Sequence, residues 1–177
     1  MKSNVKTILT KLTINPQYQL AGNELTLKVR KSPLFIRSVT FLFAFLFFIS
    51  PIVAILGVEK LHIFYFIVTF LFALMGFYLL RIALWNTYGK EIITFNNDII
   101  DYIADYGWFK DSKKQIAVKE RLDYGIMPIG YEEDHEGTLI IGLEEPSLVC
   151  VTKMPKFDLE MLISKLYDFS ASHHENQ

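Results

Sequence analysis

The sequence predicts a membrane α-helical hairpin joined to a cytoplasmic α+β domain. Three observations predict this fold class. Two long uncharged apolar runs occupy the middle of the chain, short strand-like runs follow them, and an amphipathic helical segment comes last. The 177 residues are 51% hydrophobic, and most of the 15 Phe residues lie between Phe35 and Phe77. This uneven distribution is untypical of a freely soluble protein.

The first apolar run, Ser38–Val58, contains no charged residue and is rich in Leu, Ile, Val and Phe. At about 1.5 Å per helical residue it is long enough for the roughly 30 Å hydrocarbon core of a bilayer. A cleaved secretory signal is the alternative. The run is too long for the apolar core of a signal, a polar arm precedes it, and no small-x-small cleavage site follows. We therefore expect a spanning helix at about 38–58.

The second apolar run, Leu61–Leu80, follows after only Glu59 and Lys60, so we expect a second span at about 61–84. A connection this short forces an antiparallel helical hairpin. Cationic and aromatic residues at the ends of the two runs are typical of the headgroup boundary. The expected membrane-interface anchors are Arg37, Arg81, Trp85 and Tyr88.

Lys and Arg residues cluster before the first run and after the second, which predicts that both termini face the cytoplasm. The first 37 residues are strongly basic, whereas the chain from Asn86 onward is acidic. The expected organisation is a basic arm with β-structure (1–33), the two spans (34–85), a cytoplasmic domain (86–170) and a polar tail (171–177).

Short β-like runs follow the spans, and a helical pattern from Leu159 to Phe169 ends the domain. Strands followed by one helix predict a strongly bent antiparallel sheet, or a partly open barrel, plugged by that helix. In the arm, Leu25, Leu27 and Val29 alternate with polar residues, so we expect 25–29 to add a strand to this sheet. The other expected strands are 7–14, 91–95, 99–104, 114–119, 126–131, 138–143 and 148–152.

A short motif, Trp85 followed by Gly89-Lys90-Glu91-Ile92-Ile93, leads from the second span into β-structure. With the minimal turn between the spans and the final Leu/Ile-rich helix, it resembles small bacterial two-helix membrane proteins with a pleckstrin-homology-like domain. The resemblance covers about residues 24–169. It implies a bacterial cytoplasmic (inner) membrane protein and supplies no catalytic residues. The arm before residue 24 and the acidic loop Glu132–Glu136 depart from the family pattern.

Candidate chemistry has an ordinary structural explanation in each case. The loop Glu132–Glu136 offers four carboxylates and an imidazole for a cation, but it lacks calcium-loop spacing and is typical of a solvated hairpin tip. His173-His174 has no third ligand nearby, and Cys150 on an apolar strand is typical of a buried inert thiol. We therefore expect no enzyme, no metal site and no cofactor.

A local basic and aromatic patch is the candidate lipid-facing surface, with a solvated strand edge as the alternative. This patch consists of Trp108, Phe109, Lys110, Lys113 and Lys114. The acidic domain argues against phosphoinositide specificity and against nucleic-acid binding.

The expected function is a membrane-anchored scaffold that binds a protein partner. The alternatives are a lipid or small-ligand sensor, or a small accessory or immunity subunit of an envelope complex.

Overall fold

The computed structural model describes residues 17–56, 62–96, 99–117, 122–130, 135–142 and 147–174. These residues form two compact units. The β unit comprises the described parts of Met1–Arg30, Lys90–Ala104 and Asp111–Gln177, and the helical unit comprises those of Lys31–Gly89 and Asp105–Lys110. The expected strand at 7–14 and most of the acidic loop lie outside the described residues.

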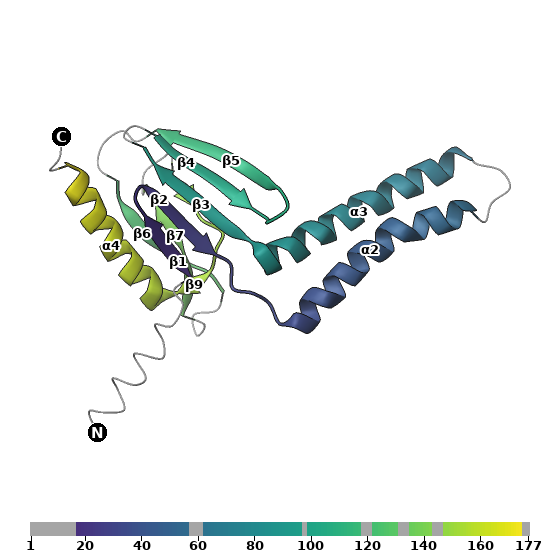
Figure 1. Cartoon of the computed structure of the whole chain (residues 1–177), viewed down its shortest axis with the longest axis horizontal. Helices are drawn as coiled ribbons and strands as arrows, with labels where there is room; N and C mark the ends of the chain where they lie inside the picture. Colours follow the sequence, from purple (N-terminus) through teal and green to yellow (C-terminus); the bar gives the residue numbers. More distant parts are fainter. Residues whose placement is uncertain are drawn as a thin grey trace, which may run out of the picture. The chain divides into compact units, whose positions relative to one another are not determined.

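The helical unit contains two long apolar helices, α2 (Leu34–Leu56) and α3 (Ile63–Tyr88), which lie side by side as an antiparallel hairpin (Figure 1). Both are long and apolar enough to cross a membrane, as the sequence predicted. The α2 helix begins before the expected boundary because Leu34, Phe35 and Ile36 extend the apolar pattern ahead of Arg37. Pro51 lies inside α2 without ending it.

Small residues let α2 and α3 approach each other closely. Ala44 and Pro51 of α2 and Gly76 of α3 are buried between apolar neighbours. A Cβ atom added to Gly76 would lie 3.1 Å from the Phe48 ring. Ala54, further along α2, is exposed.

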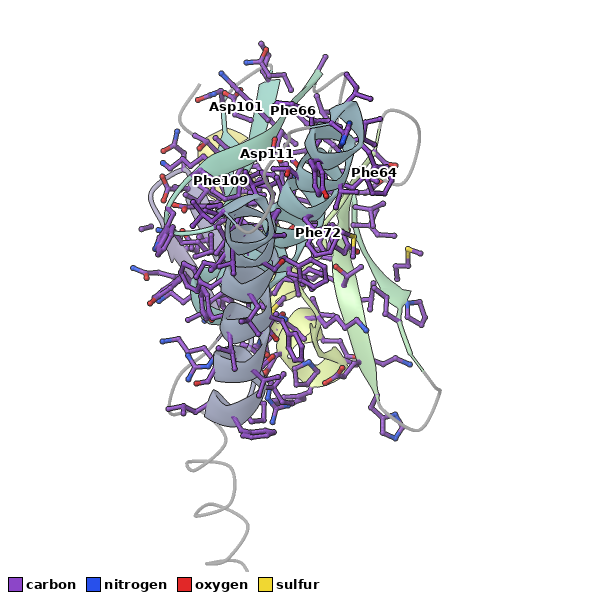
Figure 2. All side chains as sticks on the ribbon, turned by 90° about the vertical axis from the view of Figure 1, so that its right-hand side faces the viewer. Phe64, Phe66, Phe72, Asp101, Phe109 and Asp111 are labelled. Atoms are coloured by element: carbon purple, nitrogen blue, oxygen red, sulfur yellow. The ribbon has the colours of Figure 1, made fainter. Side chains whose placement is uncertain are left out.

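Aromatic rings add to this packing between the two helices. Phe47 of α2 and Phe72 of α3 pack with ring centroids 5.4 Å apart, and Phe72 is labelled in Figure 2. The other labelled rings of α3, Phe64 and Phe66, are mostly exposed. The hairpin therefore has an inner packed seam and an outer surface of large apolar side chains.

The β unit contains a five-stranded antiparallel sheet, sheet A, with the order β1-β2-β3-β4-β5. The helical hairpin lies in the chain between β2 and β3, which are neighbours in this sheet. Leu25 and Leu27 of β2 face Ile93 and Glu91 of β3 in the register. The predicted pairing of the arm with the domain is thus confirmed. The strands are β1 (Tyr18–Ala21), β2 (Glu24–Lys28), β3 (Lys90–Phe95), β4 (Ile99–Asp105) and β5 (Lys110–Ala117).

A second sheet, sheet B, consists of β6 (Tyr124–Pro128), β7 (Glu136–Ile141), β8 (Leu148–Val149) and β9 (Met154–Pro155). Both β8 and β9 pair with β7, so the single strand expected at 148–152 is wrong. The chain leaves the sheet after Val149 because the buried Glu91 carboxylate accepts the backbone N–H groups of Val151 and Thr152. The strands form two sheets, and the described residues show no closed barrel.

The last helix, α4 (Lys156–His174), runs alongside β6 and β7 (Figure 1). Leu159, Leu162 and Leu166 are fully buried and recur at helical spacing, as predicted. Phe169 packs against Phe95 of β3, with ring centroids 6.1 Å apart. The helix thus contacts both sheets and closes the apolar core of the β unit.

Candidate functional site

The C-terminal end of α3 carries three of the four predicted interface anchors, and the structure places two of them around one tyrosine. Arg81 donates a hydrogen bond from Nε to the Tyr106 hydroxyl at 3.0 Å. The Arg81 guanidinium carbon also lies 4.9 Å from the centre of the Tyr106 ring, within cation–π range. Trp85 packs on the same ring with a centroid distance of 5.0 Å. Tyr106 therefore joins a cation and an aromatic residue that belong to successive turns of α3.

Tyr106 belongs to the turn between β4 and β5, residues Tyr106–Phe109, which with the flanking Asp105 and Lys110 is part of the helical unit. The Tyr106 N–H donates to the Phe109 carbonyl at 2.9 Å, so only Gly107 and Trp108 form the loop. Gly107 has a φ of +89°, and glycine at this position is typical of a type II′ hairpin turn. The Asp105 carboxylate accepts the Gly107 N–H at 2.8 Å, which further fixes the turn.

The turn contacts α3 at two further levels. Phe109 stacks on Tyr106 at 4.8 Å and on Phe77 of α3 at 6.2 Å, and Phe109 is labelled in Figure 2. At the other end, a Cβ atom on Gly107 would lie 2.7 Å from Cβ of Tyr88. Only glycine permits this approach. We call the resulting group the α3–turn cluster; it consists of Phe77, Arg81, Trp85, Tyr88, Tyr106, Gly107, Trp108 and Phe109.

The predicted lipid-facing patch divides between the two units. Trp108 is 66% exposed, Phe109 is half-buried in the α3–turn cluster, and Lys110 is exposed. Lys113 and Lys114 belong to the β unit. The Lys114 ammonium lies 6.0 Å from the centre of the Tyr102 ring. Lys114 thus contacts the ring of a core tyrosine.

The fourth predicted anchor, Arg37, lies in the first turn of α2. It is at the same end of the hairpin as the α3–turn cluster, because the Ser32 N–H donates to the Asn86 carbonyl at 3.3 Å. The Arg37 Nε atom is buried, and no hydrogen-bond partner for it is found among the described residues. Cationic and aromatic side chains from both helices are therefore gathered at one end of the hairpin.

A buried polar network forms a second candidate site, in the β unit. Glu91 of β3 is 0% exposed. Its Oε1 accepts hydrogen bonds from the Tyr102 hydroxyl and the Val151 N–H, both at 2.7 Å. Its Oε2 accepts the Thr152 N–H at 2.8 Å. One carboxylate of sheet A therefore holds the chain between β8 and β9, which explains why the expected strand 148–152 is interrupted.

Thr138 of β7 supports the same segment from the other side. Its hydroxyl donates to the Cys150 carbonyl at 2.5 Å and lies 3.2 Å from the Thr152 carbonyl. Cys150 itself is buried. Burial, and secondarily the negative charge of Glu91, raises the pKa of the Cys150 thiol well above its ordinary value. These features are typical of a structural thiol and agree with the sequence interpretation.

The described residues contain no group of three or more His, Cys, Asp or Glu side chains arranged to hold a metal ion. Of the acidic loop, His135 and Glu136 are described, and Glu136 lies in β7. His173 and His174 lie in the last turn of α4.

Sequence reasoning missed Tyr106 and Glu91, the central residues of the two sites. A signal for Tyr106 existed, because Gly107 interrupts a polar and aromatic run between two strand-like segments, which is a hairpin pattern. For Glu91 the signal was an acidic residue inside the apolar run of β3. Its partners, Val151 and Thr152, lie 60 and 61 residues away, so the sequence around Glu91 gives no indication of them.

Neither the models of known protein families, nor the curated proteins, nor the solved structures searched contain a match to this chain.

Proposed function

We propose that this protein is a membrane-anchored interaction module of the bacterial inner membrane, whose helical hairpin crosses the bilayer and whose β unit binds a protein partner on the cytoplasmic side. The exposed surface of the hairpin supports the membrane assignment. Phe70, near the middle of α3, is 63% exposed. Large apolar side chains cover the outer faces of both helices, and such a surface is stable in lipid rather than in water.

The orientation rests on charge. Lys28, Arg30 and Lys31 precede α2, Arg81 lies in the C-terminal part of α3, and Lys90 follows α3 at the start of β3. Positive residues at these ends favour the cytoplasmic side, which would also hold the β unit. We further propose that the β unit is pleckstrin-homology-like, a proposal supported by its two antiparallel sheets and the C-terminal helix packed on them.

The observation that carries the interaction role is a pair of exposed apolar side chains, Met127 and Val149, on one face of sheet B. Val149 of β8 pairs with Ile140 of β7, and Met127 of β6 pairs with Thr138. Because side chains alternate along a strand, these residues lie on the face opposite Leu139 and Ile141, which are buried. Met127 is 44% exposed and Val149 is 43% exposed.

The two faces of sheet B therefore differ in how they are covered. The face that carries Leu139 packs on α4, since a Cβ atom on Gly137 would lie 3.3 Å from the Leu159 side chain. On the other face, the Met127 and Val149 side chains are exposed, whereas Thr138 of β7 on the same face is buried and donates to the Cys150 carbonyl. Apolar surface of this kind, next to a complete core, favours binding of a protein with a complementary apolar surface.

A photo-crosslinking amino acid placed at Val149 in intact cells tests this role directly. A matched control carries the same amino acid at Glu160, an exposed position of α4. After purification in mild detergent, mass spectrometry should identify one protein crosslinked through Val149 and not through Glu160. Val149→Asp, introduced in the protein without the crosslinking amino acid, should abolish co-purification of that partner in mild detergent. Recovery of crosslinks to lipid alone, or of the same proteins from both positions, would contradict the interaction role.

The alternative of a lipid sensor is favoured by a different observation, the exposed Trp108 and Lys110 beside the end of α3. An exposed indole next to a cation is typical of surfaces that contact phospholipid headgroups. This alternative predicts that function depends on Trp108 and Lys110 and tolerates Val149→Asp. The two roles are thus separated by one substitution on each surface.

A further inference from the structure

The turn between β4 and β5 lies against a long stretch of one face of α3. Its contacts reach Phe77, Arg81, Trp85 and Tyr88, which are spaced at i, i+4, i+8 and i+11. At about 1.5 Å per residue this contact covers roughly 17 Å of helix. The turn therefore runs along the helix axis rather than touching its end.

The position of the first charged residue in α3 indicates how deep in the bilayer the turn contacts the helix. The helix has 26 residues and so is about 39 Å long, more than the roughly 30 Å hydrocarbon core. Its uncharged part ends at Leu80, and Arg81 is the first charged residue after it. Phe77 lies one turn, about 6 Å, inside that boundary. Because Phe109 stacks on Phe77, Phe109 lies at the edge of the hydrocarbon core whenever α3 spans the membrane.

The composition of the turn fits this depth. From Tyr106 to Phe109 it has three aromatic residues and one glycine, and no charge. Trp108 exposes most of its indole, and the neighbouring Tyr88 of α3 is also mostly exposed. Trp and Tyr side chains concentrate at the headgroup level, where an apolar ring and a polar N–H or hydroxyl are both accommodated. Lys110, immediately after the turn, is placed to extend toward lipid phosphates.

We infer that the β4–β5 turn is a second membrane-contacting element, which inserts Trp108 into the headgroup region of the leaflet that contains the C-terminal end of α3. This inference rests on the proposed spanning role of the hairpin. It assigns the exposed Trp108 surface to phospholipid, and not to a protein partner. Continuity with the exposed apolar surface of α3 argues for this occupant, because the same leaflet would cover both.

The two Trp residues of the chain allow a direct test. Trp85→Phe leaves Trp108 as the single tryptophan, and Trp108→Phe leaves Trp85 near the end of α3, so excitation at the red edge of tryptophan absorption reports each one alone. Each full-length variant is reconstituted into phosphatidylcholine vesicles whose acyl chains carry bromine either near the headgroup or near the methyl end. We expect a loss of emission from both residues, larger with bromine near the headgroup, and little quenching of Trp108 by aqueous acrylamide.

The outcomes separate the two proposals. If brominated lipid quenches Trp85 while aqueous acrylamide quenches Trp108, the insertion of the turn is overturned. The spanning hairpin is then still supported. Absence of lipid quenching for both residues would overturn both. Lipid quenching of Trp108 in the Trp85→Phe variant supports the insertion.

A second measurement leaves Trp85 in place, in case its replacement disturbs folding. Trp108→Cys carries a nitroxide label, while the buried Cys150 stays unlabelled. Phe70→Cys and Lys31→Cys supply standards for the apolar and the aqueous sides of the helical unit. Collision of the Trp108→Cys label with oxygen should exceed that of the Lys31→Cys label and fall below that of the Phe70→Cys label. Accessibility to a water-soluble nickel chelate equal to that of the Lys31→Cys label would overturn the insertion.

Discussion

The carboxylate of Glu91 accepts a hydrogen bond from the hydroxyl of Tyr102 at 2.7 Å, and both groups are buried in the β unit. Glu91 lies on β3 and Tyr102 on β4, so this bond joins neighbouring strands of sheet A. The same carboxylate accepts the N–H groups of Val151 and Thr152, which precede β9. A single side chain thus connects sheet A with the segment that links β8 to β9.

Glu91→Gln should lower the free energy of unfolding by about 1.5–3 kcal/mol, the cost of losing a hydrogen bond to a charged group in the interior. The amide can still accept at Oε1, but its NH2 group would face the Thr152 N–H, another donor. Glu91→Leu should cost more, because it leaves three donors, two of them buried, without an acceptor. Thermal unfolding in detergent micelles, followed by circular dichroism, measures both effects.

Glu24→Gln is the control for this pair of variants, since Glu24 lies on the adjacent strand and is exposed. It should leave the free energy of unfolding within about 0.5 kcal/mol of that of the unchanged protein. Equal melting temperatures for Glu91→Leu and Glu24→Gln would show that the Glu91 network does not stabilise the β unit.

The Cys150 thiol should react slowly with iodoacetamide in the folded protein. The reactive species is the thiolate, and burial raises the pKa of Cys150, so little thiolate exists near neutral pH. Glu91→Gln should not restore fast alkylation, because burial outweighs the charge of Glu91 as a cause. Mass spectrometry after timed alkylation, with and without denaturant, measures the rate. The Lys31→Cys variant supplies an exposed thiol for comparison, and equal alkylation rates for Cys150 and for this introduced thiol would contradict the burial.

Gly107→Ala should destabilise the helical unit by more than the roughly 1–2 kcal/mol cost of a left-handed alanine. Its φ is +89°, and the added methyl would also lie 2.7 Å from Cβ of Tyr88. Gly22→Ala is the matched variant, because its φ is +58° and no atom lies within 4 Å of the new methyl. Gly107→Ala should additionally shift the emission of Trp85 to longer wavelength in a Trp108→Phe background. If the two alanine variants cost the same, the turn does not pack closely on α3.

The elements that the sequence predicted well are those with a local signal. The two helices of the hairpin follow from uncharged runs long enough for a bilayer, and β2 follows from the alternation of Leu25 and Leu27. The helix α4 follows from the spacing of Leu159, Leu162 and Leu166. In each case the residues that bury the element lie within a few positions of one another.

The elements that the sequence predicted poorly depend on partner residues far away in the chain. The strand expected at 148–152 breaks because Glu91, far away in the chain, binds the N–H groups of Val151 and Thr152. The predicted patch divides because Phe109 turns toward Phe77, while Lys114 contacts Tyr102. Periodicity within a short window carries no information about such pairings.

Lys110→Glu should weaken the stabilisation of the protein by anionic lipid. A lysine near an anionic surface contributes about 1 kcal/mol, and Lys110 follows the turn that we place at the headgroup level. Lys114 is unsuited to this test, because its reversal would also remove the contact with Tyr102. The measurement compares melting temperatures in nanodiscs of neutral phosphatidylcholine and in nanodiscs containing phosphatidylglycerol.

Lys153→Glu is the control for this charge reversal, because Lys153 is exposed and the substitution changes the net charge equally. We expect the difference between the two kinds of nanodisc to shrink for Lys110→Glu and to stay unchanged for Lys153→Glu. The effect should also fade at high salt, since charges at a membrane surface are screened within about 10 Å at 0.1 M ionic strength. A salt-independent loss, or an equal loss in neutral nanodiscs, would mean that Lys110 acts through folding of the turn and not through lipid phosphates.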